Sequence, residues 1–304
     1  MKAVSPLTQT SDIESINKIP VTTLVKKYRD NYEIDASPFF NGLDAVEVYE
    51  CKKTGYQFFY PFNLDGDGPF YEQLERFDWY YLPWKWEHQQ TLALLETGQS
   101  VLEVGCGPAK FIEKLQAEGF QAVGLELNEH CVNQAKAKGM DVRHELVQDH
   151  AKNSPAQYDL VCSFQVLEHI ADVSSYIQGC LDCLKPGGKL VVAVPNNDAF
   201  IKEAQWNVLN MPPHHMGLWK EDSLRNLQSC FSMETKEIRF EPLEPRHFHW
   251  YRKVQEGKYL PKENSVLYKI YHKMGLYRII DKWIQLRHQQ IHGHSIMAIY
   301  QKLA

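Results

Sequence analysis

Two acidic residues and a pair of glycines are spaced in a way that suits a nucleotide-like ligand. Glu103 is followed by Gly105 and Gly107, and Glu126 follows a second apolar run. Glycines two residues apart allow a sharp turn and let backbone N–H groups approach a ligand at the start of a helix. Glu103 could hold an ammonium group, and Glu126 could accept hydrogen bonds from a ribose diol. Lys110 replaces the third glycine of a pyrophosphate-binding turn, which weakens a dinucleotide interpretation.

Three histidines are the candidate proton acceptors. His169 lies in residues 167–170, just after an apolar run, and His214 and His215 lie in the proline-containing segment 211–219. A histidine near a substrate hydroxyl can act as a general base close to neutral pH. Each could instead be structural, His169 by supporting the following loop and helix, and the adjacent pair by making hydrogen bonds at a helix start. Both interpretations stay open at this point.

The elements that must position these residues alternate along the middle of the chain. The runs SVLEVGCG, QAVGLEL, YDLVCSF and KLVVAVP are typical of buried strands. Between them, the stretch that ends at Gly119 and residues 129–138 and 173–184 have the apolar spacing of helices. This alternation predicts an α/β fold with a parallel, doubly wound sheet and a ligand at the carboxyl ends of its strands.

The change in composition and pattern along the chain predicts two structural parts. Residues 1–85 are irregular and rich in aromatic side chains, and we expect them to form a small N-terminal subdomain. Residues 86–304 form the main domain, with a helical insertion at about residues 243–290 that combines basic, aromatic and aliphatic residues. We expect this insertion to be a solvated amphipathic segment, with lipid contact as the alternative.

Five motifs together resemble a known family. VLEVGCGPAKF, GLELN, YDLVCSFQVLEHI, LKPGGKLVVAVPN and HHMGLW occur in this order within about residues 88–240. They resemble the class I S-adenosylmethionine-dependent methyltransferases, and most closely the branch of ubiquinone-pathway O-methyltransferases and bacterial sugar methyltransferases. The resemblance implies a Rossmann-like fold with a mostly parallel seven-stranded sheet and helices on both faces. It also implies S-adenosylmethionine as cofactor, with S-adenosylhomocysteine as product.

The resemblance implies a cofactor role for specific residues at the ends of the strands. Glu103 and the glycine turn would contact the methionine end, and Glu126 the ribose hydroxyls. Leu127, Leu146 and Val147 would lie beside the adenine. A departure from the family is Ala109, where many relatives have glycine. The complete implied set is Glu103, Gly105, Cys106, Gly107, Glu126, Leu127, Leu146, Val147, Phe164 and Gln165.

The pattern of histidines and cysteines does not favour a metal site. His292 and His294 have no neighbouring carboxylate or cysteine that would complete a ligand set. Residues 51–55 resemble the start of a zinc knuckle, but Thr54 stands where the second cysteine would be. We therefore expect no bound metal.

Composition limits the partners. The net charge is −5, which argues against a nucleic acid or an anionic membrane as the main partner. No apolar run is long enough to span a bilayer, so we expect no integral membrane segment. The polar first eighteen residues lack the apolar centre of a signal peptide, and seven scattered cysteines favour reduced thiols. Together these features predict a cytoplasmic protein.

The predicted function is S-adenosylmethionine-dependent methylation of a small hydroxylated acceptor. O-methylation of a sugar, a glycan precursor or a related metabolite is the leading hypothesis, and it depends on family analogy. The alternatives are an N- or C-methyltransferase, a cofactor-binding module without catalysis, and a nicotinamide-dependent oxidoreductase. The sequence indicates neither the oligomeric state nor the acceptor.

Overall fold

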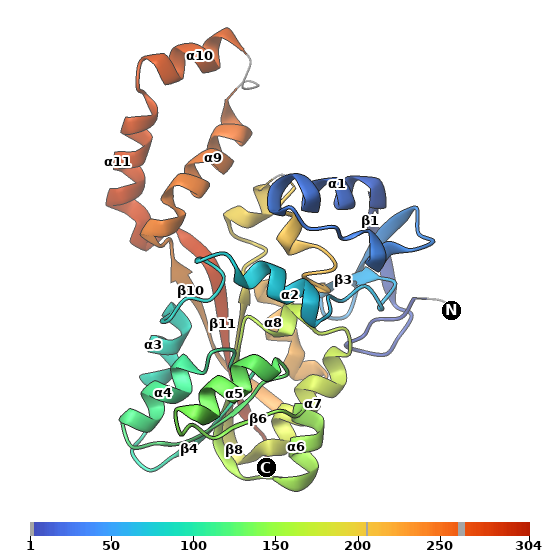
Figure 1. The fold of residues 1–304 in the computed structure, drawn as a ribbon, viewed down its shortest axis with the longest axis vertical. Helices are drawn as coiled ribbons and strands as arrows, with labels where there is room; N and C mark the ends of the chain where they lie inside the picture. Colours follow the sequence, from blue (N-terminus) through green and yellow to red (C-terminus); the bar gives the residue numbers. More distant parts are fainter. Residues whose placement is uncertain (1–2, 205, 261–264) are drawn as a thin grey trace.

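The computed structural model describes residues 3–204, 206–260 and 265–304, and a seven-stranded sheet forms its centre (Figure 1). The strand order is β10-β11-β8-β7-β4-β5-β6. The five strands from β4 to β8 pair in parallel, whereas β11 runs antiparallel to both β8 and β10. The strands are β4 (Ser100–Val104), β5 (Gln121–Leu125), β6 (Val142–Arg143), β7 (Tyr158–Phe164), β8 (Leu184–Pro195), β10 (Met233–Pro242) and β11 (His292–Lys302). The predicted mostly parallel α/β sheet is confirmed.

Helices cover both faces of this sheet because its buried strands present apolar side chains to both sides. On one face, α4 (Lys110–Ala117) and α5 (Glu129–Ala137) pack with α3 (Trp86–Leu92). On the other face lie α6 (Val147–Asn153), α7 (Val173–Cys183) and α8 (Glu221–Asn226). The Asn128 side chain caps the start of α5, four residues after β5 ends, and the Asp172 side chain caps the start of α7.

The N-terminal part forms a second, antiparallel sheet that takes one strand from elsewhere. Its order is β1 (Ile13–Pro20), β2 (Ala45–Cys51), β3 (Gln57–Tyr60) and β9 (Gly217–Leu218). Helices α1 (Val21–Tyr32) and α2 (Gly68–Glu75) pack on it. Residues 1–85 therefore share their core with the segment that carries the adjacent histidines. The Tyr28 hydroxyl strengthens this link by donating to the carbonyl oxygens of Val208 and Met211.

Three helices separate β10 from β11 and extend away from the sheet (Figure 1). They are α9 (Phe248–Tyr259), α10 (Val266–Lys273) and α11 (Tyr277–Arg287). Their root packs through Val254 and Ile284 against Leu243 and Phe200. None of the described helices is both long and apolar enough to cross a membrane.

Candidate active site

A cavity of about 1580 Å³ opens at the carboxyl ends of the parallel strands. Its walls come from the ends of β4, β5 and β7, from α2 and the loop after it, and from the root of α9. A pocket for one small ligand usually measures roughly 300–1,000 Å³. The cavity is therefore large enough for a cofactor and a second molecule together. All ten residues that the resemblance implied for cofactor binding line it.

The glycine turn forms one end of the cavity. Gly105 has a φ of +77°, and a Cβ atom there would meet the side chain of Val166. Gly107 has a φ of +49°, and a Cβ atom would come within 3.2 Å of Tyr81. Ala109 also takes the left-handed conformation, with a φ of 55°, and its methyl group is buried. A small residue therefore fits at this departure from the family, although glycine would adopt the conformation with less strain.

Glu126 is tied to this turn rather than solvated. Its Oε2 accepts a hydrogen bond from Gly107 N at 2.7 Å, and its Oε1 accepts from Leu127 N at 2.7 Å and Asn128 N at 2.8 Å. A carboxylate has about four acceptor positions, so roughly one remains for a ligand hydroxyl. The side chain therefore fixes the end of β5 to the turn while it faces the cavity.

Glu103 places a buried carboxyl group with an unpaired oxygen in the cavity. Its side chain is buried, and Oε2 has no hydrogen-bond partner among the described residues. Burial raises its pKa to about 8, against a smaller opposing effect of Lys85. A buried carboxylate without a partner is unfavourable, and a cationic group in the cavity would satisfy it.

The implied adenine contacts lie at the rim of the cavity. Leu127 and Leu146 are 55% and 48% exposed, which is unusual for leucine unless a ligand or partner covers it. Val147 is buried beneath them as the first residue of α6. This apolar rim suits a flat aromatic ring.

The remaining implied residues form the inner wall. Burial raises the pKa of the Cys106 thiol, so it is protonated and inert. Phe164 packs against the rings of His88 and Phe111. Gln165 has a left-handed φ of 57°, and its Nε2 donates to Glu87 Oε1, as well as to the hydroxyl of Ser295.

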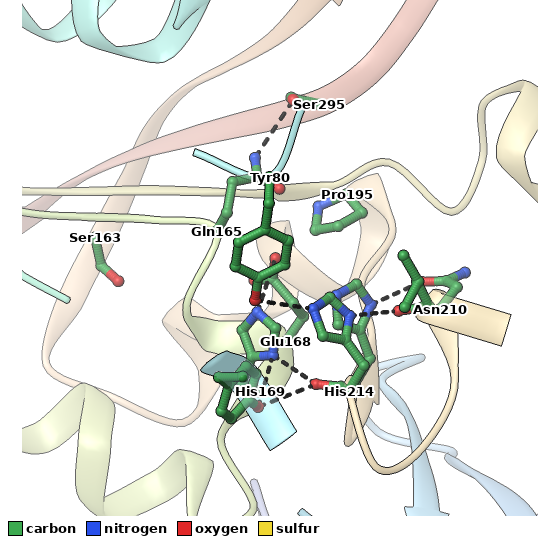
Figure 2. Close-up of polar contacts among 12 residues, drawn as sticks. Tyr80, Ser163, Gln165, Glu168, His169, Pro195, Asn210, His214 and Ser295 are labelled. Atoms are coloured by element: carbon green, nitrogen blue, oxygen red, sulfur yellow. Dashed lines mark hydrogen bonds and ion pairs between the residues drawn. The ribbon is translucent and has the colours of Figure 1, made fainter. Parts of the chain in front are cut away.

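The three candidate histidines form one cluster (Figure 2). One ring nitrogen from each of His169, His214 and His215 lies within 4.8 Å of the other two. Each Nδ1 faces an oxygen acceptor: His169 faces the His214 carbonyl, His214 the Leu209 carbonyl and His215 the Asn210 side chain. These acceptors assign the ring proton to Nδ1, which leaves each Nε2 with a free lone pair.

Burial keeps the cluster uncharged. It lowers the pKa of His169 to about 4 and holds the pKa values of His214 and His215 well below the ordinary range. The Tyr80 hydroxyl lies 3.2 Å from His214 Nε2, where it can donate to the free lone pair. The cluster therefore already binds one hydroxyl group, and its rings are neutral near neutral pH, with Nε2 of each unprotonated.

The same three nitrogens could be considered as metal ligands. A tetrahedral site with bonds of about 2.1 Å needs nitrogens roughly 3.4 Å apart, closer than the 4.8 Å limit of this cluster. The His214 and His215 rings are stacked with centroids 4.5 Å apart and an interplanar angle of 21°, so their in-plane lone pairs lie in two nearly parallel planes. This geometry suits recognition of a hydroxyl better than a metal ion, and a metal-free site remains our prediction.

The sequence analysis missed two further residues of the cluster. Glu168 is buried, its Oε1 lies 3.9 Å from His169 Nε2, and its Oε2 has no hydrogen-bond partner within the described ranges. Burial raises the pKa of this carboxyl to about 8. Tyr71 contacts His169 Nδ1 at 3.2 Å. The adjacency of Glu168 to His169 was a usable signal for the first, whereas nothing local distinguished Tyr71 from other aromatic residues.

Comparison with known proteins agrees with this geometry. Residues 79–229 match the family model described as "Methyltransferase domain". This chain contains a class I S-adenosylmethionine-dependent methyltransferase domain. The match includes the glycine turn, Glu103, Glu126 and the histidine cluster.

Relatives of the methyltransferase domain match a limited part of the chain. The ubiquinone biosynthesis O-methyltransferase of Klebsiella pneumoniae is 33% identical over 107 residues, which cover 33% of this chain and 44% of that protein. The enzyme of the same name from Vibrio cholerae matches equally, at 33% identity and 44% of its length. The chain thus spans less than half of these relatives. A methyltransferase structure from Archaeoglobus fulgidus aligns with 70% of this chain and 90% of its own, at 18% identity and a TM-score of 0.48.

The cavity fits S-adenosylmethionine on two observations. The unpaired Glu103 carboxylate suits the ammonium group of its methionine part, and the glycine turn leaves the space that a Cβ atom would fill. Glu126 and the leucine rim then face the ribose and the adenine. The expected cofactor of the methyltransferase domain is thus compatible with the residues that line its cavity.

Proposed function

We propose that this protein is an S-adenosylmethionine-dependent O-methyltransferase whose acceptor is a small hydroxylated molecule, such as a sugar, a glycan precursor or a related metabolite. The observation that carries the proposal is the presence in one cavity of the unpaired Glu103 carboxyl group and the unprotonated Nε2 atoms of the histidine cluster. The hydroxyl acceptor is favoured because the Tyr80 hydroxyl already pairs with His214. The names of the ubiquinone O-methyltransferases support the same chemistry by analogy.

The cofactor, when bound, supplies a methyl group on a positively charged sulfur. The residues of the chain position and desolvate the partners, which is most of the catalysis needed for an in-line displacement. Glu103 binds the ammonium group, and Glu126 holds the ribose while it keeps the glycine turn in place. The buried walls of the cavity exclude water from the acceptor hydroxyl.

The histidine cluster provides the proton acceptor. As the acceptor oxygen loses its proton, an Nε2 lone pair of the cluster takes it. His214 is the best placed of the three, because its Nε2 already contacts a hydroxyl and its Nδ1–H is held by the Leu209 carbonyl at 2.7 Å. His169 and His215 border the same space and orient the acceptor.

Calorimetric titration with S-adenosylhomocysteine tests the cofactor part of the proposal. We expect micromolar affinity, roughly −8 kcal/mol, that is lost in Glu126→Ala and retained in Glu113→Ala, which removes an exposed carboxylate outside the cavity. Thermal unfolding of both variants controls for folding. No binding of S-adenosylhomocysteine, or binding of NADH in its place, would contradict the proposal.

Replacement of the histidines tests the hydroxyl acceptor. Once an acceptor is found, His214→Gln should lower kcat by about 10²-fold or more, because a general base contributes about 10²–10⁴-fold. An N- or C-methyltransferase does not need a strong base at this position. A rate that barely changes in His214→Gln and His169→Gln would therefore favour those alternatives.

A further inference from the structure

The helical arm, defined as residues 248–287, exposes an unusual amount of apolar surface. More than half of the large apolar side chains that are exposed in the described chain belong to it, and most of the others line or border the cavity. Trp283 is 52% exposed and Leu286 is 74% exposed. A monomeric protein rarely leaves such a contiguous patch uncovered. The exposed apolar residues of the arm are Tyr259, Val266, Leu267, Ile270, Met274, Leu276, Ile279, Trp283 and Leu286.

The exposed apolar residues form one stripe on each of the last two helices. On α10 and just after it they recur at 266, 270 and 274, and along α11 at 276, 279, 283 and 286. This is the spacing of residues on one face of a helix. Each of these two helices therefore has one apolar face that points away from the rest of the arm.

The inner faces of the arm are fixed by polar contacts. Arg252 forms ion pairs with Glu256 at 2.6 Å and with Asp281 of α11 at 2.7 Å. The Tyr271 hydroxyl of α10 donates to the same Glu256 carboxylate at 3.1 Å. Ile284 is fully buried at the root. These contacts hold all three helices together while the apolar stripes face outward.

The arm has a net positive charge, whereas the chain as a whole is negatively charged. It contains nine Lys and Arg residues against three Asp and Glu residues, a net charge of +6. Because the whole chain has a net charge of −5, the remaining residues carry −11. Lys269, Lys273 and Lys282 are exposed and form no ion pair within the described part of the chain. The arm therefore combines apolar stripes with an electrostatic preference for anionic surfaces.

We propose that the helical arm binds the surface of an anionic lipid membrane, with the apolar stripes of α10 and α11 at the boundary between headgroups and acyl chains. Amphipathic helices with a basic polar side and exposed Trp and Leu residues bind in this way. A second copy of the chain is disfavoured as the partner, since two arms that each carry +6 would repel one another. The residues outside the arm carry a net charge of −11, so an anionic membrane repels them and attracts the arm.

The arm is continuous with the cavity. Trp250 of α9 lines the cavity, as do Arg246 and His247 just before this helix. Helix α9 therefore connects the proposed membrane contact directly to the active site. The membrane proposal itself does not depend on the proposed methylation activity, because lipid binding is measured without cofactor or acceptor.

Vesicle flotation tests the proposal with the full chain. We expect the protein to float with vesicles of 70% phosphatidylcholine and 30% phosphatidylglycerol, and to bind pure phosphatidylcholine at least about tenfold more weakly. Trp283→Ser/Leu286→Ser should lower the partition coefficient at least about tenfold, because both side chains supply apolar surface. Ile16→Ser, which removes an exposed apolar side chain from β1, is the matched control and should bind normally.

Charge reversal tests the electrostatic part. Lys269→Glu/Lys273→Glu/Lys282→Glu should abolish flotation with the anionic vesicles while S-adenosylhomocysteine binding and thermal stability stay as in the unmodified protein. The control reverses the same number of charges on the sheet domain, at Lys136, Lys138 and Lys152.

Two outcomes would overturn the proposal. The first is that the unmodified protein does not float with anionic vesicles at low salt, or that the arm variants float as well as it does. The second is a stable dimer in light scattering that Trp283→Ser/Leu286→Ser converts to a monomer, which would identify a second copy as the partner of the stripe.

Discussion

The buried carboxyl group of Glu103 gives the sharpest prediction. Burial raises its pKa to about 8, from an ordinary value of 4.5. An acid whose folded pKa lies above its unfolded value is held more tightly in its protonated form by the folded protein. Its contribution to stability is therefore complete below about pH 4.5 and is lost as the pH rises through about 8. Near neutral pH this residue should make the ligand-free protein less stable.

The size of this effect follows from the two pKa values. At pH 7 the cost is about 3.5 kcal/mol, because the pH lies about 2.5 units above the unfolded pKa and each unit corresponds to about 1.4 kcal/mol. Glu103→Gln keeps the shape of the side chain and removes its charge. We expect this variant to raise the free energy of unfolding by up to about 3.5 kcal/mol at pH 7 and to leave it nearly unchanged at pH 4, as measured by urea denaturation.

Cofactor binding should favour the ionised form of Glu103, whereas burial in the ligand-free protein favours the protonated form. If the ammonium group of the ligand holds Glu103 ionised, the protein should release about 0.9 proton for each S-adenosylhomocysteine bound at pH 7. Calorimetric titration in phosphate and in Tris buffer measures the number of protons released, because the two buffers differ in their heat of protonation and the binding heats differ accordingly. Glu103→Gln should bind more weakly and release no proton. A destabilised Glu103→Gln variant, together with no proton release by the unmodified protein, would refute the reasoning and identify Glu103 as an ionised structural residue.

Three further predictions concern the turn and the histidines. Gly105→Ala should lower the free energy of unfolding by about 2–4 kcal/mol, because it combines a positive φ with a clash against Val166, and a loss under about 0.5 kcal/mol in urea denaturation would contradict this. Ala109→Gly should leave the fold intact and stabilise it by up to about 1 kcal/mol in the same assay, since its φ of 55° favours glycine, and a clear loss would count against the strain. His169 should be neutral with its proton on Nδ1 at pH 6, because its pKa is about 4, and a cationic ring in ¹⁵N NMR spectra would disprove it.

The central sheet was predictable because local patterns specify it. The apolar runs that end near Glu103 and Phe164 are short and buried on both faces, as strands of a parallel sheet must be. Helix boundaries also carried local signals, such as the Asn128 cap. The N-terminal sheet was not predictable in the same way, because its strand β9 comes from Gly217–Leu218, more than 150 residues after its partner β3.

The net charge of the chain does not show how the charge is distributed. The net value of −5 argued against an anionic membrane as the main partner, yet it is the sum of +6 on the helical arm and −11 elsewhere. For Glu126, the position after a strand predicted a ligand contact but not its bonds to the glycine turn. Its three bonds to backbone N–H groups depend on the folded turn and leave room for about one more donor.

The histidine cluster required knowledge of the tertiary structure, since its residues come from two loops that are about 45 residues apart. Pairing of β9 with β3 places the second loop over the first, and Met216 N donates to the Glu168 carbonyl at 2.7 Å to fix the two together. The His214 carbonyl then orients the ring of His169, so one histidine assigns the tautomer of another. A base near each loop could be inferred from residue type alone. That the free nitrogens lie together and uncharged beside an unpaired Glu168 follows only from the packing of the N-terminal sheet against the methyltransferase domain.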